Sequence, residues 1–285
     1  MEHAAALVVV AAIQALPRLA KTIRKVWKEF QRIQQPTEKT DNHVKMNIRR
    51  KAMEHYGRQL NFDRKYNIVF AGVAGVGKSS LINALRGLVD DDPDAAPVDT
   101  NQKSQWATPY EVQENVVLWD MPGAGTKHHP SDTYFTSNFL AAFDFMVIVT
   151  DNRLRQEDIG LAKQAKQYDV PFAIVRTKSD QDIMSRLRRK GIVNNLGVSH
   201  LDSESLTVQY HVTARELTQD VRRNMLEQLS LFNLHDRAVL VVSSWVVRNS
   251  GEMTEKIADK FDAFDENHLM NLVETFLMMA RSHVV

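Results

Sequence analysis

Short apolar runs alternate with amphipathic segments along the central part of the chain. Such runs span Tyr66–Ala71, Val116–Asp120, Phe143–Thr150, Val170–Arg176 and Ala238–Ser243. Continuous apolar runs of this length are typical of strands that are covered on both faces in a parallel sheet. Between two of them, Gln156–Tyr168 places Leu161, Ala165 and Tyr168 on one helical face. The alternation predicts an α/β fold with a doubly wound, mostly parallel sheet and ligand loops at the carboxyl ends of its strands.

The first 64 residues follow a different pattern. Apolar side chains recur at three- and four-residue steps from Leu19 to Ile33, with Lys and Arg on much of the remaining surface. Pro36 breaks this pattern, and we expect a second helix from about Asp41 to Leu60. A basic amphipathic helix packs on a neighbouring domain or lies on an anionic membrane, and packing is the commoner case.

Composition narrows the class of protein. The chain has 285 residues, of which 44% are apolar, enough for one or two domains. Its net charge of +1 gives no overall field that would attract nucleic acid, although residues 1–64 are basic. The absence of cysteine excludes disulfides and thiolate zinc sites and is compatible with the cytoplasm. The longest uncharged apolar stretch, Ala4–Leu16, is shorter than the roughly 20 residues that a membrane span needs.

The segment Gly72–Ser80 carries the strongest chemical signal. It reads GVAGVGKSS, follows the apolar run Tyr66–Ala71 and precedes a helical pattern, which is the context of a G-x-x-x-x-G-K-[ST] phosphate-binding loop (P-loop). Glycines let backbone N–H groups curl around an anion, and the helix N-terminus adds its positive end. We expect Lys78 to reach the β- and γ-phosphates and the Ser79 hydroxyl to bind Mg²⁺. The expected phosphate-binding residues are Gly75, Val76, Gly77, Lys78, Ser79 and Ser80.

A second motif, Asp120-Met121-Pro122-Gly123, closes the apolar run Val116–Asp120. An aspartate at this strand end can hold the Mg²⁺ shell, and the Gly123 N–H can approach a γ-phosphate and sense its loss. A further Mg²⁺ ligand is expected from the preceding loop, for which Thr100 is preferred over Thr108 and Ser104. Residues 88–100 contain two prolines and five acids and are expected to form a mobile loop.

A third motif, Thr177-Lys178-Ser179-Asp180, predicts guanine rather than adenine recognition. The Asp180 carboxylate can accept from both the ring N–H and the exocyclic amine of guanine, and the aliphatic stem of Lys178 can cover the base. Strand order assigns a base contact to Ser243 and Ser244 at the end of the last strand.

The residue that orients the hydrolytic water is not evident. Many GTPases use a glutamine after this glycine, but here Ala124 and Gly125 follow Gly123. Backbone groups are one substitute. Arg153 or Arg155, acting in cis or across a dimer, is another, although exposed arginines are more often surface charges. The neighbouring His128-His129 is expected to be a solvated surface pair.

These segments together resemble the immunity-related GTPases, the interferon-inducible family with a Ras-like G domain set among helices. The resemblance covers about residues 65–265 and is carried by APVDT, ATPYEV, NVVLWDMPGAGT, PSDTYF, DNRLRQEDIGLAKQ, VRTKSD and QDVRRNMLEQL. It implies GTP binding and hydrolysis with low intrinsic turnover, and self-assembly as a homo-oligomer that we place at the nucleotide face. It also implies association with intracellular or pathogen-containing vacuole membranes in cell-autonomous defence.

The resemblance also fixes the expected domain organisation. We expect an N-terminal helical region in residues 1–64, a GTP-binding domain in 65–265, and the start of a truncated or shortened C-terminal helical region in 266–285. Two departures stand out: Ser244 occupies the position of the family's base-reading Asn, and residues 181–214 do not align.

Two functions of different classes fit this sequence. The first is a GTPase whose site is completed by self-association, with Lys78, Ser79 and Gly123 as catalytic residues and Ser79, Thr100 and Asp120 around Mg²⁺. The second is a nucleotide-gated binding or scaffold module with negligible turnover. An ATPase is a distant third.

Overall fold

The computed structural model describes residues 42–98, 106–113, 116–194, 199, 201–234, 237–244, 265 and 269. All of them belong to the larger of the two compact units into which the chain divides, Lys39–Val285. The expectations for the N-terminal apolar run and its amphipathic helix, for Thr100 and for Ser104 lie outside the described residues.

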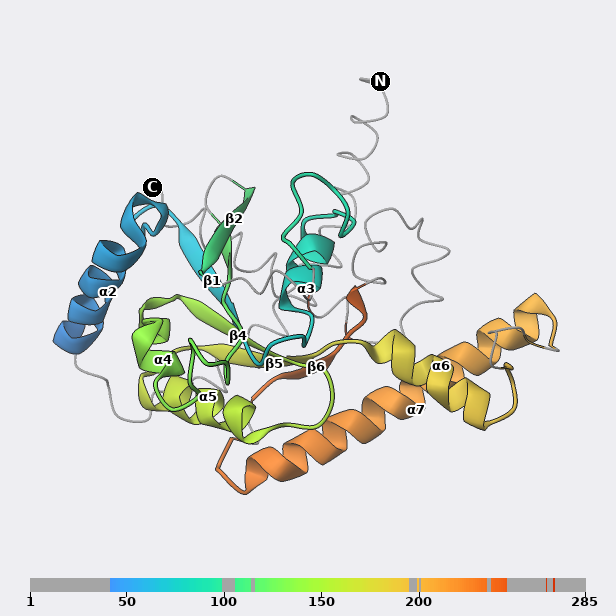
Figure 1. Ribbon diagram of the computed structural model, residues 1–285. Helices are drawn as coiled ribbons and strands as arrows, with labels where there is room; N and C mark the ends of the chain where they lie inside the picture. The colour runs from blue at the N-terminus through green and yellow to red at the C-terminus, as the bar shows by residue number, and fades with distance from the viewer. Residues whose placement is uncertain are drawn as a thin grey trace, which may run out of the picture. The chain divides into compact units, whose positions relative to one another are not determined.

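A six-stranded sheet with the order β2-β3-β1-β4-β5-β6 forms the centre of the described unit (Figure 1). Its strands are β1 (Tyr66–Ala71), β2 (Thr108–Gln113), β3 (Val116–Asp120), β4 (Phe145–Thr150), β5 (Phe172–Arg176) and β6 (Val239–Val241). All neighbouring strands are parallel except β2 and β3. The predicted doubly wound, mostly parallel sheet is confirmed.

The sheet also contains an unpredicted strand, β2. It is an antiparallel edge strand whose residues Thr108–Tyr110 are only partly buried and whose register shifts between Glu111 and Gln113. An edge strand needs no continuous apolar run, so the pattern that identifies the central strands is missing from it.

Strand register brings the ligand loops together at one edge. Phe70 pairs with Asp120, Ala71 with Ile148, Thr150 with Arg176, and Arg176 with Val241. Because these residues end or nearly end parallel strands, the segments that follow them emerge side by side. The strand order reverses at β1, where open α/β sheets bind their ligands.

Helices and short 3₁₀ turns precede and connect the strands (Figure 1). They are α2 (Asn42–Tyr56), η1 (Gly57–Gln59), α3 (Lys78–Leu85), α4 (Tyr134–Ser137), η2 (Leu140–Ala142), α5 (Gln156–Gln167), α6 (Ser179–Arg189) and α7 (Ser203–Ser230). The helix expected in residues 41–60 is therefore α2 followed by η1. Within residues 181–214, which the resemblance does not cover, 181–189 belong to α6 and 203–214 to the first part of α7.

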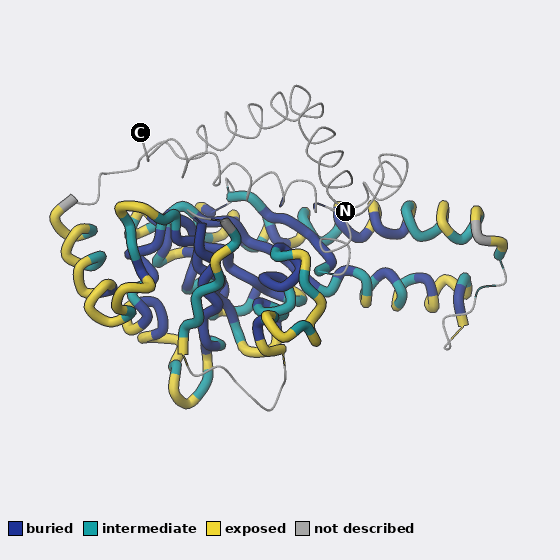
Figure 2. The backbone as a smooth tube through the Cα atoms, turned by 90° about the horizontal axis from the view of Figure 1, so that it is seen from above, coloured by how far each residue is buried: buried dark blue, intermediate teal, exposed yellow. Residues whose placement is uncertain are grey.

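One apolar cluster joins α2, α4, α5 and the end of α7 to the sheet, whose strands are the buried centre of Figure 2. The predicted inner face of α5 is confirmed, because Leu161 and Ala165 are buried and Tyr168 packs against the cluster. A second cluster holds α6 against α7 and reaches Val241 of β6. The sheet edge is thus supported by packed helices.

Helix α2 is clamped to the sheet by both charge and aromatic packing. Arg49 Nη2 lies 2.6 Å from Asp144 Oδ1, and Asp144 Oδ2 accepts a 2.8 Å hydrogen bond from the Asn67 N–H. The Tyr56 ring lies 5.2 Å from that of Trp119, the residue before Asp120. The second helix is therefore packed on the sheet, and the alternatives for the first, amphipathic helix stay open. Among the described residues, no helix has the length and apolar character to cross a bilayer.

Candidate functional site

The P-loop has the backbone conformation that its glycines predict. Gly75 and Gly77 have φ values of +82° and +91°, and Gly77 caps α3 by accepting a 3.0 Å hydrogen bond from the Leu81 N–H. Residues with side chains seldom adopt such φ values. The loop therefore leads directly into a helix N-terminus, an arrangement that favours anions.

The Lys78 side chain is buried under this loop. It is 7% exposed, and its Nζ donates 3.1 Å hydrogen bonds to the carbonyl oxygens of Gly72 and Val73. Burial lowers the pKa of Lys78 to about 8, against the opposing attraction of Asp120 and Asp158. The loop thus holds a poorly solvated cation, which phosphate oxygens would stabilise.

Ser79 and Asp120 form the next pair of the site. Ser79 Oγ donates a 2.6 Å hydrogen bond to Asp120 Oδ2. Asp120 is 4% exposed; burial raises its pKa, and the Ser79 hydrogen bond and Lys78 partly offset that effect. Its Oδ1 is buried without a hydrogen-bond partner in the part of the chain that the structure describes.

These two side chains fit Mg²⁺. The donor set is oxygen only, and the unpartnered buried Oδ1 of Asp120 is a group that a cation would satisfy. Across the described ranges, no group of three or more His, Cys, Asp or Glu side chains could hold a metal. Mg²⁺ ordinarily takes most of its other ligands from nucleotide phosphates and water.

The Asp120–Gly123 segment lies directly on the P-loop. A Cβ atom on Gly123 would come within 2.6 Å of the Cα and Cβ atoms of Ala74. The Ala124 N–H donates a 3.0 Å hydrogen bond to the Gly72 carbonyl, and Tyr134 Oη donates one of 2.6 Å to Pro122 O. The segment is therefore held in contact with the loop expected to bind phosphates.

The predicted base-reading loop is bonded to the same P-loop. Thr177 Oγ1 lies 2.6 Å from Val76 O and 3.2 Å from Thr150 O. Lys178 has φ +58°, and its Nζ donates a 2.7 Å hydrogen bond to Gly75 O and one of 3.2 Å to Asp151 Oδ2. These contacts bring the expected phosphate and guanine sites together.

Other predicted residues lie at the same edge of the sheet. Asp180 is in the first turn of α6 and half-buried, Ser243 is buried and Ser244 is half-buried. Ser80 Oγ donates a 3.2 Å hydrogen bond to Asp90 Oδ2. We therefore expect the backbone N–H of Ser80, and not its hydroxyl, to contact phosphate.

Only some of the alternative Mg²⁺ ligands and of the residues considered for orienting the hydrolytic water lie within the described residues. Thr108 begins β2, where it pairs with Asp120, and its Oγ1 donates to Trp106 O at 3.4 Å. Arg155 is the N-cap of α5 and forms a 2.7 Å ion pair with Asp151, which turns it towards the base-reading side. Thr100 stays a prediction.

Sequence comparison agrees with this arrangement. The profile of the interferon-inducible GTPase (IIGP) family matches residues 22–196, well over half of the chain. The chain belongs to the interferon-inducible GTPase family.

Curated relatives of this family member include mouse and bovine proteins. It is 36% identical over 119 residues to T-cell-specific guanine nucleotide triphosphate-binding protein 2 of Mus musculus, covering 41% of this chain and 29% of that protein. It is 32% identical over 176 residues to interferon-inducible GTPase 5 of Bos taurus, covering 61% and 34%. The matches thus span about a third or less of these relatives' lengths.

Solved structures similar to this family member include a probable GTP-binding protein engB. That match has a TM-score of 0.39 and 18% identity, and covers 68% of this chain and 97% of that one. The translation elongation factor SelB from Methanococcus maripaludis has a TM-score of 0.40 and 16% identity, with coverages of 75% and 34%. We draw no conclusion about the site from these two similarities.

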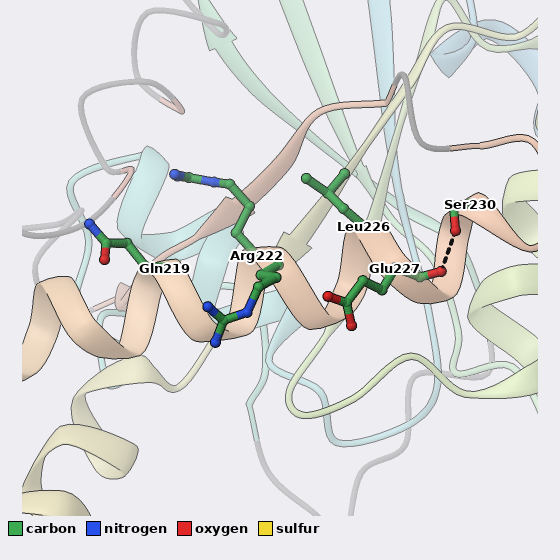
Figure 3. A pocket seen from close by; sticks show the side chains of 6 residues that line it. Gln219, Arg222, Leu226, Glu227 and Ser230 are labelled. Carbon is green, nitrogen blue, oxygen red and sulfur yellow. Dashed lines mark hydrogen bonds between the residues drawn. The ribbon is translucent and has the colours of Figure 1, made fainter.

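A concavity of about 540 Å³ on α7 is separate from the nucleotide loops of this family member (Figure 3). Its lining comes from one helix: Gln219, Arg222, Arg223, Leu226, Glu227 and Ser230. Arg222 is already paired with Asp265, with two contacts of 2.5 Å. The concavity contains none of the residues predicted to bind nucleotide.

The sequence analysis did not identify several residues whose contacts hold the loops of the site in place. Asp151 joins Lys178 to Arg155, and Tyr134 fixes the Pro122 carbonyl. Arg176, directly before the base-reading motif, is a buried charge in an otherwise apolar strand. That interruption was visible in the sequence. The partners of Asp151 and Tyr134 follow only from the fold.

Proposed function

We propose that this chain binds GTP with Mg²⁺ and hydrolyses it to GDP and phosphate. The observation that carries the proposal is the bonded junction of the P-loop and the Thr177–Asp180 segment. Thr177 and Lys178 each donate to a P-loop carbonyl, so a nucleotide's phosphates and base would meet one rigid surface. Membership of the interferon-inducible GTPase family supports the same reaction.

In the proposed mechanism, Lys78 and the P-loop N–H groups stabilise the negative charge that develops on the transferring phosphate. The Gly123 N–H approaches the γ-phosphate, because its segment lies against Ala74. Ser79 and Asp120 would hold Mg²⁺, which would supply positive charge against the phosphate oxygens. Asp180 accepts from the guanine ring N–H and amine, and Lys178 covers the base.

The position after Gly123 bears on turnover. Ala124 is 2% exposed, its methyl side chain has no polar atom, and its N–H is bonded to Gly72 O, so neither its side chain nor its N–H can orient a water molecule. We therefore propose that a second copy, docking on the nucleotide face, completes the site and that turnover is low without it. The lack of a water-orienting side chain at Ala124 also favours the second candidate function, a nucleotide-gated binding module. We propose association with an intracellular membrane under either function.

Nucleotide titration of Asp180→Ala tests the binding part of the proposal. We expect its GTP affinity to fall at least about 100-fold, since hydrogen bonds that read a base edge or a substrate polar group are worth this much. Its ATP affinity should not change. Arg186→Met, later in α6 and paired with Asp220 of α7, would control for damage to the helix if its melting temperature matches. Unchanged GTP binding in Asp180→Ala would disprove the guanine assignment.

A further inference from the structure

Arg176 is a buried cation at the end of β5. It is 4% exposed, and its four strand neighbours Phe172–Val175 are apolar and buried. Taking a guanidinium out of water costs several kcal/mol unless hydrogen bonds and opposite charges replace its hydration. The contacts of this side chain therefore indicate what it stabilises.

The guanidinium joins β5 to the first turn of α6. Its Nη1 donates a 3.2 Å hydrogen bond to Ser179 Oγ, and its Nη2 donates to Asp182. These two partners flank Asp180, the residue proposed to read guanine. Arg176 itself belongs to none of the three nucleotide motifs.

The same network reaches the chain after β6. Ser179 Oγ donates a 2.8 Å hydrogen bond to Val242 O, and the Val242 N–H donates one of 2.8 Å to Arg176 O. Ser243 follows Val242 directly. The Arg176 side chain thus ties β5 to α6, and Ser179 Oγ and the Arg176 backbone carbonyl extend the network to the segment after β6.

Charges of both signs act on Arg176. Its pKa is lowered by burial and by Arg186, whereas Asp151 and Asp180 attract the cation. Lys178, between Arg176 and Ser179, has φ +58°, a conformation that a side chain adopts only where its surroundings enforce it. The bonds on both sides of Lys178 supply that constraint.

We propose that Arg176 is a positioning residue for guanine recognition. It holds the first turn of α6 against the end of β5, and through Ser179 against the segment after β6, which fixes the carboxylate of Asp180 relative to the base. This inference rests on the proposed GTP binding. A two-point hydrogen bond tolerates errors of only about 0.5 Å, so a small shift of the turn weakens both contacts.

The test compares GDP with inosine diphosphate, which lacks the exocyclic amine, and with ADP. In Arg176→Lys and Arg176→Met we expect GDP affinity to fall about tenfold and inosine diphosphate affinity to fall less, so that the preference between them shrinks. A merely structural loss would weaken both nucleotides equally. Asp182→Ala should shift the preference in the same direction, because it removes one anchor of Arg176.

Arg186→Met is the matched control. Arg186 lies on α6 and pairs with Asp220 of α7 at 3.1 Å, so its loss loosens α6 away from the base-reading loop. It should leave the nucleotide preference unchanged. If the Arg176 variants do not fold, Asp182→Ala still decides, because Asp182 is 41% exposed.

The outcomes separate this inference from the proposed function. A wild-type chain without preference for GDP over ADP would contradict the proposed function itself. An intact preference in folded Arg176 variants and in Asp182→Ala, with the preference lost in Asp180→Ala, would overturn only the role of Arg176.

Discussion

At the scale of single residues, Lys78 illustrates how the fold prepares a site for anions. Its ammonium group is buried beside backbone carbonyls instead of water, and its pKa is lowered to about 8. Bound phosphates would raise that pKa again. Nucleotide affinity is therefore coupled to the protonation of this one side chain.

This coupling predicts a pH dependence. Above pH 8 the nucleotide-free protein loses the Lys78 proton, which the complex retains, so binding takes up a proton and affinity falls by up to tenfold per pH unit. Titration of GDP between pH 7 and 9 would measure it. The Lys78→Met variant should bind weakly and without this inflection, and a flat wild-type profile would contradict the account.

Gly123 supplies a second prediction, because its Cβ position is filled by Ala74 at 2.6 Å. Gly123→Ala should lower the free energy of unfolding by about 1–3 kcal/mol and slow phosphate release at least about tenfold, since overpacking displaces the loop. Urea unfolding and a phosphate assay would measure both. Gly160→Ala in α5 has nothing within 4 Å of the new Cβ and should instead stabilise the protein.

The sequence predicts such residues only where a motif fixes their surroundings. Gly75, Gly77, Lys78 and Asp120 were found because phosphate chemistry dictates their spacing. The hydrogen bond from Tyr134 to Pro122 and the ion pair of Arg155 with Asp151 depend on the folded structure, so no local sequence pattern predicts them. Thr100 is a motif-based expectation outside the described residues.

At the scale of elements, one face of α3 organises the loop that follows it. Asn83 is fully buried; its Nδ2 donates 3.0 Å hydrogen bonds to Asp90 Oδ1 and Ala96 O, and its Oδ1 accepts one of 2.7 Å from the Ala96 N–H. Arg86 Nη1 donates to Asp94 O at 2.8 Å. The acidic loop predicted to be mobile is thus bonded to the P-loop helix within residues 88–98.

Loss of these bonds should be measurable. Asn83→Ala leaves the buried backbone groups of Ala96 without partners, so we expect the free energy of unfolding to fall by about 1–3 kcal/mol. Limited proteolysis at the acidic residues 90–94 should become faster. Asn138→Ala, which loses one 2.8 Å hydrogen bond to Tyr134 O in α4, is the control and should leave that cleavage unchanged. Equal cleavage in both variants would show that Asn83 does not hold the loop.

The sequence predicts the position of a strand where the strand is a continuous apolar run, and it does not predict the edge strand. The bounds of β1 and β3 were predicted to the residue, because both strands are buried on both faces. The edge strand β2 lacks such a run. Residues 181–214 show no functional motif in the sequence. Helices α6 and α7 bury apolar side chains against each other, and this packing accounts for their residue pattern.

At the scale of the whole molecule, we propose that a second copy completes a GTPase site. The site lies at the sheet edge that joins the P-loop, the Asp120–Gly123 segment and the base-reading loop. Ala124 cannot orient water, and Arg155 is turned towards Asp151. A second copy is therefore the proposed source of the missing group.

The most direct test is phosphate release from GTP per molecule of the 285-residue chain, measured over a hundredfold range of protein concentration. Lys78→Ala and ATP serve as controls. The account predicts release that requires GTP, rises per molecule with concentration and is absent from Lys78→Ala. Release that is equal in Lys78→Ala, or no release at any concentration despite GTP binding, would contradict it.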